Sequence, residues 1–306
     1  MTSGTDTAGG CLGTGTTFGT FGELLQGVLP DGRAFLVTLP IDRWARARFH
    51  YRQEDPTLHV VPAHKCKAHT AARLALASVG RRGGGLLHLE SDLPEGKGLA
   101  SSSADLVATV RAVGDAIGVR FTPEEIEALL REIEPSDGVM YDGIVAFCHQ
   151  QVRLLGKFGH LLPLTVVAHD VGGRVDTISH NRRPPPFHAA ERQEYARLLA
   201  ELREAVACGD LATVGHISTR SAELNRRIRA RDDLEHLRSA CRELDGIGLV
   251  LTHSGTMLGV AFASDDPELD VKTKSLRAAC AALPGTVSVF RSLGAGGQQP
   301  ARRGQQ

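Results

Sequence analysis

LPEGKGLASSSADLVATV, residues 93–110, joins a glycine-rich turn to the beginning of a helix. Gly96 and Gly98 permit positive φ angles and let other groups approach the backbone closely. After the three serines, apolar residues recur at helical spacing along one face: Leu106, Val110, Val113 and Ile117. An ordered element therefore follows the glycines at once, and the stretch is not a flexible linker.

A glycine-rich turn at a helix N-terminus is typical of a site for phosphate. The first backbone N–H groups of a helix have no partner within it, and the helix dipole is positive at that end. Serine hydroxyls placed there can also reach Mg²⁺ or a phosphate oxygen. The turn is not a Walker loop, because no GxxxxGK[ST] pattern occurs. Serine is also a common N-cap residue, so the residues alone leave a simple capped turn equally open.

The segments around this turn predict a mixture of strands and helices. In the first half, we expect strands at 34–42 and 85–91 and a helix at 68–80. Thr122, Pro123 and Glu125 form a capping box with proline at the first helical position, which predicts a second helix start. The second half predicts further strands and helices, at 164–170, 195–208, 233–244, 247–252, 257–263 and 286–290. Helices together with antiparallel strands indicate an α+β fold.

The length of 306 residues predicts two domains, with a boundary near residues 157–163. We place the domains at 16–160 and 161–293. Glycine and threonine are abundant in residues 1–15, which predicts a mobile N-terminus, and the apolar-poor tail 294–306 predicts disorder.

The composition excludes several classes of partner. Lys plus Arg (35) equals Asp plus Glu (35), so neither nucleic acid nor a membrane surface is expected. No run of about 18 apolar residues occurs, and the N-terminus lacks the pattern of a secretion signal, which predicts a cytoplasmic protein. The six cysteines have no metal-binding spacing and are expected to be reduced and mostly buried.

Five further segments make the interpretation of the turn more specific. PEGKGLASSSAD resembles the second motif of the GHMP kinases, P-x-x-x-G-L-[GSA]-S-S. THSGTMLGVAF (252–262) resembles the third motif of that family, and TFGTFGELLQG (17–27) with LVTLPID (36–42) resembles the first. The segments GELLQG (22–27), GKGLASS (96–102), EPSDGVM (134–140) and GGRVDT (172–177) resemble the L-threonine kinase branch, in that branch's order.

The resemblance implies the two-domain GHMP kinase fold of class α+β. Its N-terminal domain is a ribosomal-protein-like β-α-β unit that binds ATP, and its C-terminal domain is a ferredoxin-like α+β unit. It also implies an ATP-dependent kinase that uses Mg²⁺ and phosphorylates the hydroxyl of a small metabolite, most simply L-threonine or a related hydroxy amino acid.

The resemblance also assigns residues to ATP and the metal. The phosphates are expected at Pro94, Glu95, Gly96, Lys97, Gly98, Leu99, Ala100, Ser101, Ser102 and Ser103. Ser102 and Glu134 are the expected Mg²⁺ ligands. Lys65 and Lys67 are interpreted as a solvated helix start, with a place near the nucleotide as the alternative.

Asp137 is expected to be the catalytic base that accepts the proton of the substrate hydroxyl, with Asp142 as the competing candidate. An Asx turn is the structural alternative for Asp137, because Ser-Asp-Gly is favourable turn chemistry. Mevalonate-type members pair this aspartate with an N-terminal lysine, and residues 19–21 contain none. Arg43 and Arg182 are candidates for the replacement cation.

The substrate is expected near Glu23, Gln26, Asp176, Thr177, His253, Ser254 and Gly255. Glu23 and Gln26 would bind the amino group of an amino acid, with a surface turn as the alternative. Homoserine and an amino alcohol of a natural-product pathway remain alternative substrates. A non-catalytic ligand-binding regulator of the same fold remains an alternative function, and a homodimer is left open.

Overall fold

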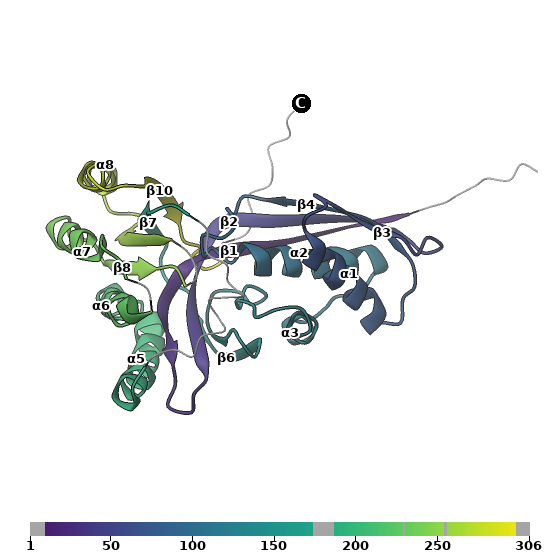
Figure 1. Ribbon diagram of the computed structural model, residues 1–306, viewed down its shortest axis with the longest axis horizontal. Helices are drawn as coiled ribbons and strands as arrows, with labels where there is room; N and C mark the ends of the chain where they lie inside the picture. Colours follow the sequence, from purple (N-terminus) through teal and green to yellow (C-terminus); the bar gives the residue numbers. More distant parts are fainter. Residues whose placement is uncertain (1–9, 174–186, 229, 254–255, 298–306) are drawn as a thin grey trace, which may run out of the picture.

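The computed structural model describes residues 10–173, 187–228, 230–253 and 256–297. Asp176 and Thr177, Arg182, and Ser254 and Gly255 lie outside these residues. The described chain forms one mixed sheet with helices packed against it, so the predicted α+β class is confirmed. The molecule is elongated, with α1–α3 towards one end and α5–α8 along the other (Figure 1).

Two long strands, β1 (Cys11–Val28) and β2 (Ala34–Arg52), connect the two ends of the molecule (Figure 1). They pair antiparallel from Cys11 with Tyr51 to Val28 with Ala34, and a tight turn with Gly32 at φ +87° joins them. The sequence predicted the first part of β2 and missed β1, whose glycines and threonines hide its apolar periodicity.

The remaining strands extend the sheet on both sides of this pair. They are β3 (Leu58–Val61), β4 (Gly84–Ser91), β5 (Ile144–Cys148), β6 (Arg153–Gly159), β7 (Leu164–Asp170), β8 (Gly248–Leu251), β9 (Met257–Ala263) and β10 (Thr286–Arg291). The order is β10-β7-β9-β8-β1-β2-β4-β3, with β5 paired to β2 and β6. Only β3 and β4 pair in parallel among the described strands. The predicted domain boundary at residue 160 stays a prediction.

Three helices cover one face of the sheet at the β3–β4 end: α1 (Cys66–Ser78), α2 (Ser101–Ile117) and α3 (Pro123–Arg131). Both bonds of the predicted capping box are present, because Thr122 and Glu125 exchange side-chain to backbone hydrogen bonds. The helix α2 buries twelve of its seventeen residues between the sheet and its neighbours. It is therefore the central support of the glycine-rich turn that precedes it.

Four helices lie at the other end: α5 (Ala189–Cys208), α6 (Leu211–Leu224), α7 (Leu234–Glu243) and α8 (Leu269–Cys280). A short 3-10 turn, Asn225–Arg227, follows α6. Gly209 ends α5 in the left-handed conformation, as the sequence indicated. A separate apolar cluster, which includes Leu237, Phe262 and Leu276, fills the space between α7, α8 and the β7–β10 strands.

The predicted mobile N-terminus is wrong for residues 11–15, which begin β1 and pair with residues 47–51 of β2. The glycines of this segment allow β1 to pack closely against α2. A Cβ atom on Gly13 would lie 2.2 Å from the backbone nitrogen of Ala116, and one on Gly15 would lie 2.1 Å from the carbonyl oxygen of Ala108. The strand thus approaches the backbone of α2 more closely than any side chain permits.

The structure also bears on the predictions for the cysteines and for the C-terminal tail. Cys148, Cys241 and Cys280 are buried, but Cys11, Cys66 and Cys208 are exposed, so the cysteines are not mostly buried. Within the predicted disordered tail, Gly294–Gly297 form a hydrogen-bonded turn, and the rest lies outside the described residues. None of the helices in the described residues has the length and apolar character needed to cross a membrane.

Gly15→Ala should lower the free energy of unfolding by about 2 kcal/mol or more, because the new methyl group would overlap the backbone of α2. Denaturant titration measures this loss. Leu12→Ala on the same strand is the control. That side chain is 55% exposed, so its removal should change stability by less than about 0.5 kcal/mol. Equal stability of Gly15→Ala and the unchanged protein would contradict the close packing of β1 on α2.

Candidate active site

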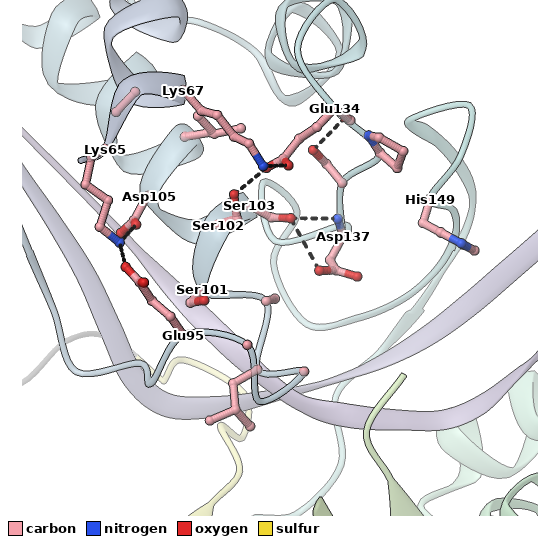
Figure 2. A pocket seen from close by; sticks show the side chains of 18 of the residues that line it. Lys65, Lys67, Glu95, Ser101, Ser102, Ser103, Asp105, Glu134, Asp137 and His149 are labelled. Carbon is pink, nitrogen blue, oxygen red and sulfur yellow. Dashed lines mark hydrogen bonds and ion pairs between the residues drawn. The ribbon is translucent and has the colours of Figure 1, made fainter. Parts of the chain in front are cut away.

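A pocket of about 330 Å³ lies where the glycine-rich turn meets the start of α1 and the segment after α3. Figure 2 shows the side chains that point into it. The lining also includes Glu23 from β1, His149 after β5 and His253 after β8. Segments from six separate parts of the chain therefore converge on one cavity.

The glycine-rich turn wraps one side of this pocket. Gly96 and Gly98 have φ angles of +70° and +74°, and Ala100 at +57° is the N-cap of α2. No side chain caps the helix, so Ser101–Ser103 lie within the first turn and do not act as its cap. The simple capped turn is therefore excluded, and the N-terminal N–H groups of a seventeen-residue helix border the cavity.

Eight of the ten predicted phosphate-binding residues line the pocket: Glu95, Gly96, Gly98, Leu99, Ala100, Ser101, Ser102 and Ser103. The other two, Pro94 and Lys97, are not part of the lining. Lys97 instead extends to Asp170, at the end of β7.

The predicted metal pair, Ser102 and Glu134, lies together on the pocket wall. The Ser102 hydroxyl donates a short hydrogen bond to one Glu134 oxygen, and the Lys67 ammonium contacts the other (Figure 2). The arrangement gives one carboxylate and one hydroxyl, both hard oxygen donors, beside the helix N-terminus. No group of three or more metal-binding side chains occurs among the described residues.

The predicted base, Asp137, is half-buried and faces the pocket next to this pair. Its backbone N–H donates to Ser103 Oγ at 3.0 Å, and Ser103 Oγ lies 3.3 Å from Asp137 Oδ2. Burial raises the pKa of Asp137 to about 6, with the Ser103 hydrogen bond opposing the shift and the Glu134 charge adding to it. The competing Asp142 is 84% exposed, pairs with His160 and does not line the pocket.

Glu23 is a buried acid rather than part of a surface turn. It lies at the point where β1 meets β8, paired with Leu251, immediately after Gly22 at φ +53°. Its side chain is buried, and Oε2 accepts no hydrogen bond from the described residues. Burial, and next the Asp137 charge, raise its pKa well above the ordinary value. The strand thus places at the cavity wall an acid that has no ion pair with a cation among the described residues.

The other predicted substrate residues separate into two groups. His253 lines the pocket, where its ring packs 4.8 Å from that of His149. Gln26 is not part of the lining. Its amide donates to the carbonyl of Leu251 and contacts His253 Nδ1 at 2.8 Å, so it supports that histidine.

The cations of the site come from the start of α1. Lys65 contacts Asp105 at 2.6 Å and Glu95 at 2.5 Å, and Lys67 contacts Glu134. The interpretation of both lysines as a solvated helix start is therefore wrong. No acidic residue occupies the first turn of α1, and this absence is a signal that the lysines find their partners elsewhere.

Asp105 and His149 are pocket residues that sequence reasoning missed. Asp105 interrupts the apolar run of α2, and an acid within such a run is a recognisable signal of a buried ion pair. His149 carries no such signal, because it follows a short strand. The candidate cation Arg43 is exposed on β2 and is not part of the pocket lining.

Comparison with known proteins gives this pocket a context. Residues 65–149 match the family of the GHMP kinases N terminal domain. The chain is 22% identical over 187 residues to an L-threonine kinase of Citrobacter freundii, which covers 60% of this chain and 64% of that protein. The chain thus spans less than two thirds of this curated relative.

Solved structures match over nearly the whole chain. A homoserine kinase from Cytophaga hutchinsonii has a TM-score of 0.73 at 13% identity and covers 96% of this chain and 97% of its own. A mevalonate kinase of L. major, in complex with R-mevalonate, has a TM-score of 0.66 at 20% identity and covers 96% and 99%. The predicted α+β fold and the resemblance to the GHMP kinases are confirmed, and the division into two domains stays a prediction.

The raised pKa of Asp137 predicts a pH-dependent stability. Between its ordinary value of 3.8 and about 6, the folded protein holds a proton that the unfolded chain has released. Stability therefore falls as pH rises through this range and stays lower above it. The Asp137→Asn variant lacks this loss. Its free energy of unfolding, relative to that of the unchanged protein, should therefore rise by about 1–2 kcal/mol from pH 4 to pH 7.

Denaturant titrations at several pH values measure this difference. Ser103→Ala is the control, because it removes the hydrogen bond but keeps the carboxyl group, and it should retain the pH-dependent loss. A difference between Asp137→Asn and the unchanged protein that stays constant from pH 4 to pH 7 would contradict the raised pKa.

Proposed function

We propose that the protein is an ATP-dependent kinase that phosphorylates the hydroxyl of a small amino-group-containing substrate, with L-threonine as the first candidate. The observation that carries the proposal is the convergence of Ser102, Glu134 and Asp137 beside the N-terminus of α2 in one pocket. Groups suited to bind phosphate, to bind a metal ion and to accept a proton thus line one cavity. The matches to kinases support a phosphotransferase.

The glycine-rich turn is suited to the ATP phosphates. Its left-handed residues turn the backbone around the cavity, and the first N–H groups of α2 add the positive end of the dipole. Lys65 and Lys67 supply positive charge from the start of α1. Their ion pairs with acids keep them ordered before a phosphate arrives, and we propose that Lys67 takes the place of the missing N-terminal lysine as a cation at the transferred phosphate.

Mg²⁺ fits the pair of Ser102 and Glu134. Magnesium prefers oxygen ligands and in phosphotransferases is held by one or two protein groups together with substrate phosphates. When bound, it neutralises charge that develops on the phosphates. The Lys67 ammonium, which contacts the same carboxylate, shows that this position already stabilises a positive charge.

Asp137 is the proposed base. The substrate oxygen attacks the γ-phosphorus, the bond from that phosphorus to the ADP oxygen breaks, and the hydroxyl proton passes to the Asp137 carboxylate. A pKa of about 6 lets this carboxylate be ionised near neutral pH and yet bind a proton readily. Ser103 holds its orientation from both the side chain and the backbone N–H.

Glu23 supports an amino group on the substrate. A buried carboxylate without a cationic partner is costly, so a bound ammonium group would relieve a charge that the fold leaves uncompensated. An ammonium group bound at Glu23 would also place the substrate near Asp137, because the two carboxyl groups are close enough for the charge of Asp137 to raise the pKa of Glu23. A hydroxy amino acid satisfies both groups.

The kinase proposal is tested by ADP release with Mg²⁺, ATP and a panel of L-threonine, L-homoserine, L-serine and simple amino alcohols. At least one should be turned over, and Asp137→Asn should lower kcat by about 100-fold or more. Omission of Mg²⁺ should abolish turnover. An absence of ADP release with every member of the panel would favour a ligand-binding regulator.

Glu23→Gln should lower kcat/KM for the preferred amine by about 30-fold or more, because the ammonium loses its buried counter-charge. A hydroxy acid of the same skeleton without the amino group is the matched control. For this compound, Glu23→Gln should cause no loss, and the affinity for ATP should stay unchanged. Equal losses for both compounds would contradict recognition of the amine by Glu23.

A further inference from the structure

Lys97 is the one charged residue of the Gly96–Gly98 turn, and it points out of the pocket that the two glycines line. Its side chain is 17% exposed, and its ammonium lies 2.7 Å from Asp170 Oδ2. It also lies 2.8 Å from the carbonyl of Gly173 and 3.4 Å from Thr256 Oγ1. Each of its three N–H donors therefore has an acceptor in the segments at the end of β7 and just before β9.

Asp170, at the end of β7, uses both carboxylate oxygens. Oδ2 accepts from Lys97, and Oδ1 accepts from the Thr256 hydroxyl and from the backbone N–H of Gly172 at 3.0 Å. Burial alone would raise its pKa, but the bonds from Lys97, Thr256 and Gly172 hold the pKa below the ordinary value. The carboxylate thus stays ionised and joins three separate segments.

Thr256, just before β9, is fixed in turn by a buried network. Arg231 donates to its carbonyl and to Asp233, whose carboxylate also contacts His169 at 2.6 Å. Arg231, Asp233 and His169 are buried almost completely. Thr256, which contacts Lys97, is therefore held in a rigid position.

The segment that contains Thr256 also contributes to the pocket. Thr252 and Met257 are hydrogen-bonded across the β8–β9 connection that contains Thr256. The same connection carries His253, which lines the cavity. Lys97 thus links the proposed phosphate-binding turn to the segment that forms the opposite wall.

We infer that Lys97 is a positioning residue, whose ion pair with Asp170 holds the glycine-rich turn against the ends of β7 and β9. Glycines on both sides leave the turn intrinsically soft, because they restrict the backbone less than any other residue. A fixed side chain between them replaces the missing restraint. The inference deepens the proposed function, on which its consequence for ATP binding depends, since a pre-ordered turn binds phosphate without a further loss of entropy.

Hydrogen exchange of the ligand-free protein tests the ion pair without reference to catalysis. The Thr20 amide donates to the carbonyl of Leu99 in the turn, and the Val171 amide donates to the carbonyl of Thr256 at the far end. Lys97→Met should accelerate exchange of both amides by about 10-fold, and Lys97→Arg should restore most of the protection.

The matched control is Lys272→Met. Lys272 and Asp266 form an ion pair of similar length, 2.8 Å, and similar side-chain exposure, 13% and 19%, and neither residue lines the pocket. This change should leave both amides unaffected. Asp170→Asn should act as Lys97→Met does, and the double variant should add little to either single change.

Calorimetric titration with a non-hydrolysable ATP analogue and Mg²⁺ supplies the second measurement. Lys97→Met should weaken binding about 10-fold, whereas Lys272→Met should leave it unchanged. Unaltered exchange of both amides in Lys97→Met would overturn the inference. Accelerated exchange together with a wild-type protein that does not bind the nucleotide would support the ion pair and contradict the kinase.

Discussion

The antiparallel pairing of β1 with β2 is the contact on which the pocket depends. These strands run through both ends of the molecule, and Gly13 and Gly15 of β1 let α2 rest directly on the strand backbone. That contact fixes the helix whose N-terminus borders the cavity. Farther along the same strand, register shifts between Thr20 and Leu25 turn Glu23 towards the cavity. One strand therefore positions both the support of the phosphate-binding turn and the acid at the opposite wall.

The electrostatics of the cavity favour bound cations as well as phosphate. Carboxyl groups of five residues line it, against ammonium groups from two lysines: Glu23, Glu95, Asp105, Glu134 and Asp137, against Lys65 and Lys67. Three of the five acids are paired with lysines, and Glu23 and Asp137 lack a lysine contact. Burial raises the pKa of both unpaired acids, and it also raises the pKa of Asp105 despite its contact with Lys65. A Mg²⁺ ion and a substrate ammonium group would supply positive charge to these acids, whereas the ATP phosphates would face Lys65, Lys67 and the N-terminus of α2. The charges that line the pocket are thus compatible with the reactants proposed for it.

The sequence predicted the segments whose chemistry is local. The turn at residues 93–103, the capping box at Thr122 and the strands of the second half follow from spacing and residue type, and the structure contains them. It did not predict β1, because glycines that permit close packing look the same as glycines of a mobile segment. Lys65 and Lys67 were misread for a related reason, since a helix start shows its charges but not the acids that fold against them. The supporting place of Gln26 likewise depends on Leu251 and His253, which lie far along the chain.

The pairing of Glu23 with Leu251 has a consequence for the order in which the molecule is built. Residue 23 is synthesised long before its partner strand β8. Contacts between such distant residues form slowly, because a long loop must close first. The strands that pair with β2 and β4 all lie within residues 10–148, whereas the contact at Glu23 requires β8. The pocket is therefore completed last, and a nascent chain on the ribosome has its phosphate-binding turn before it has a place for the acceptor.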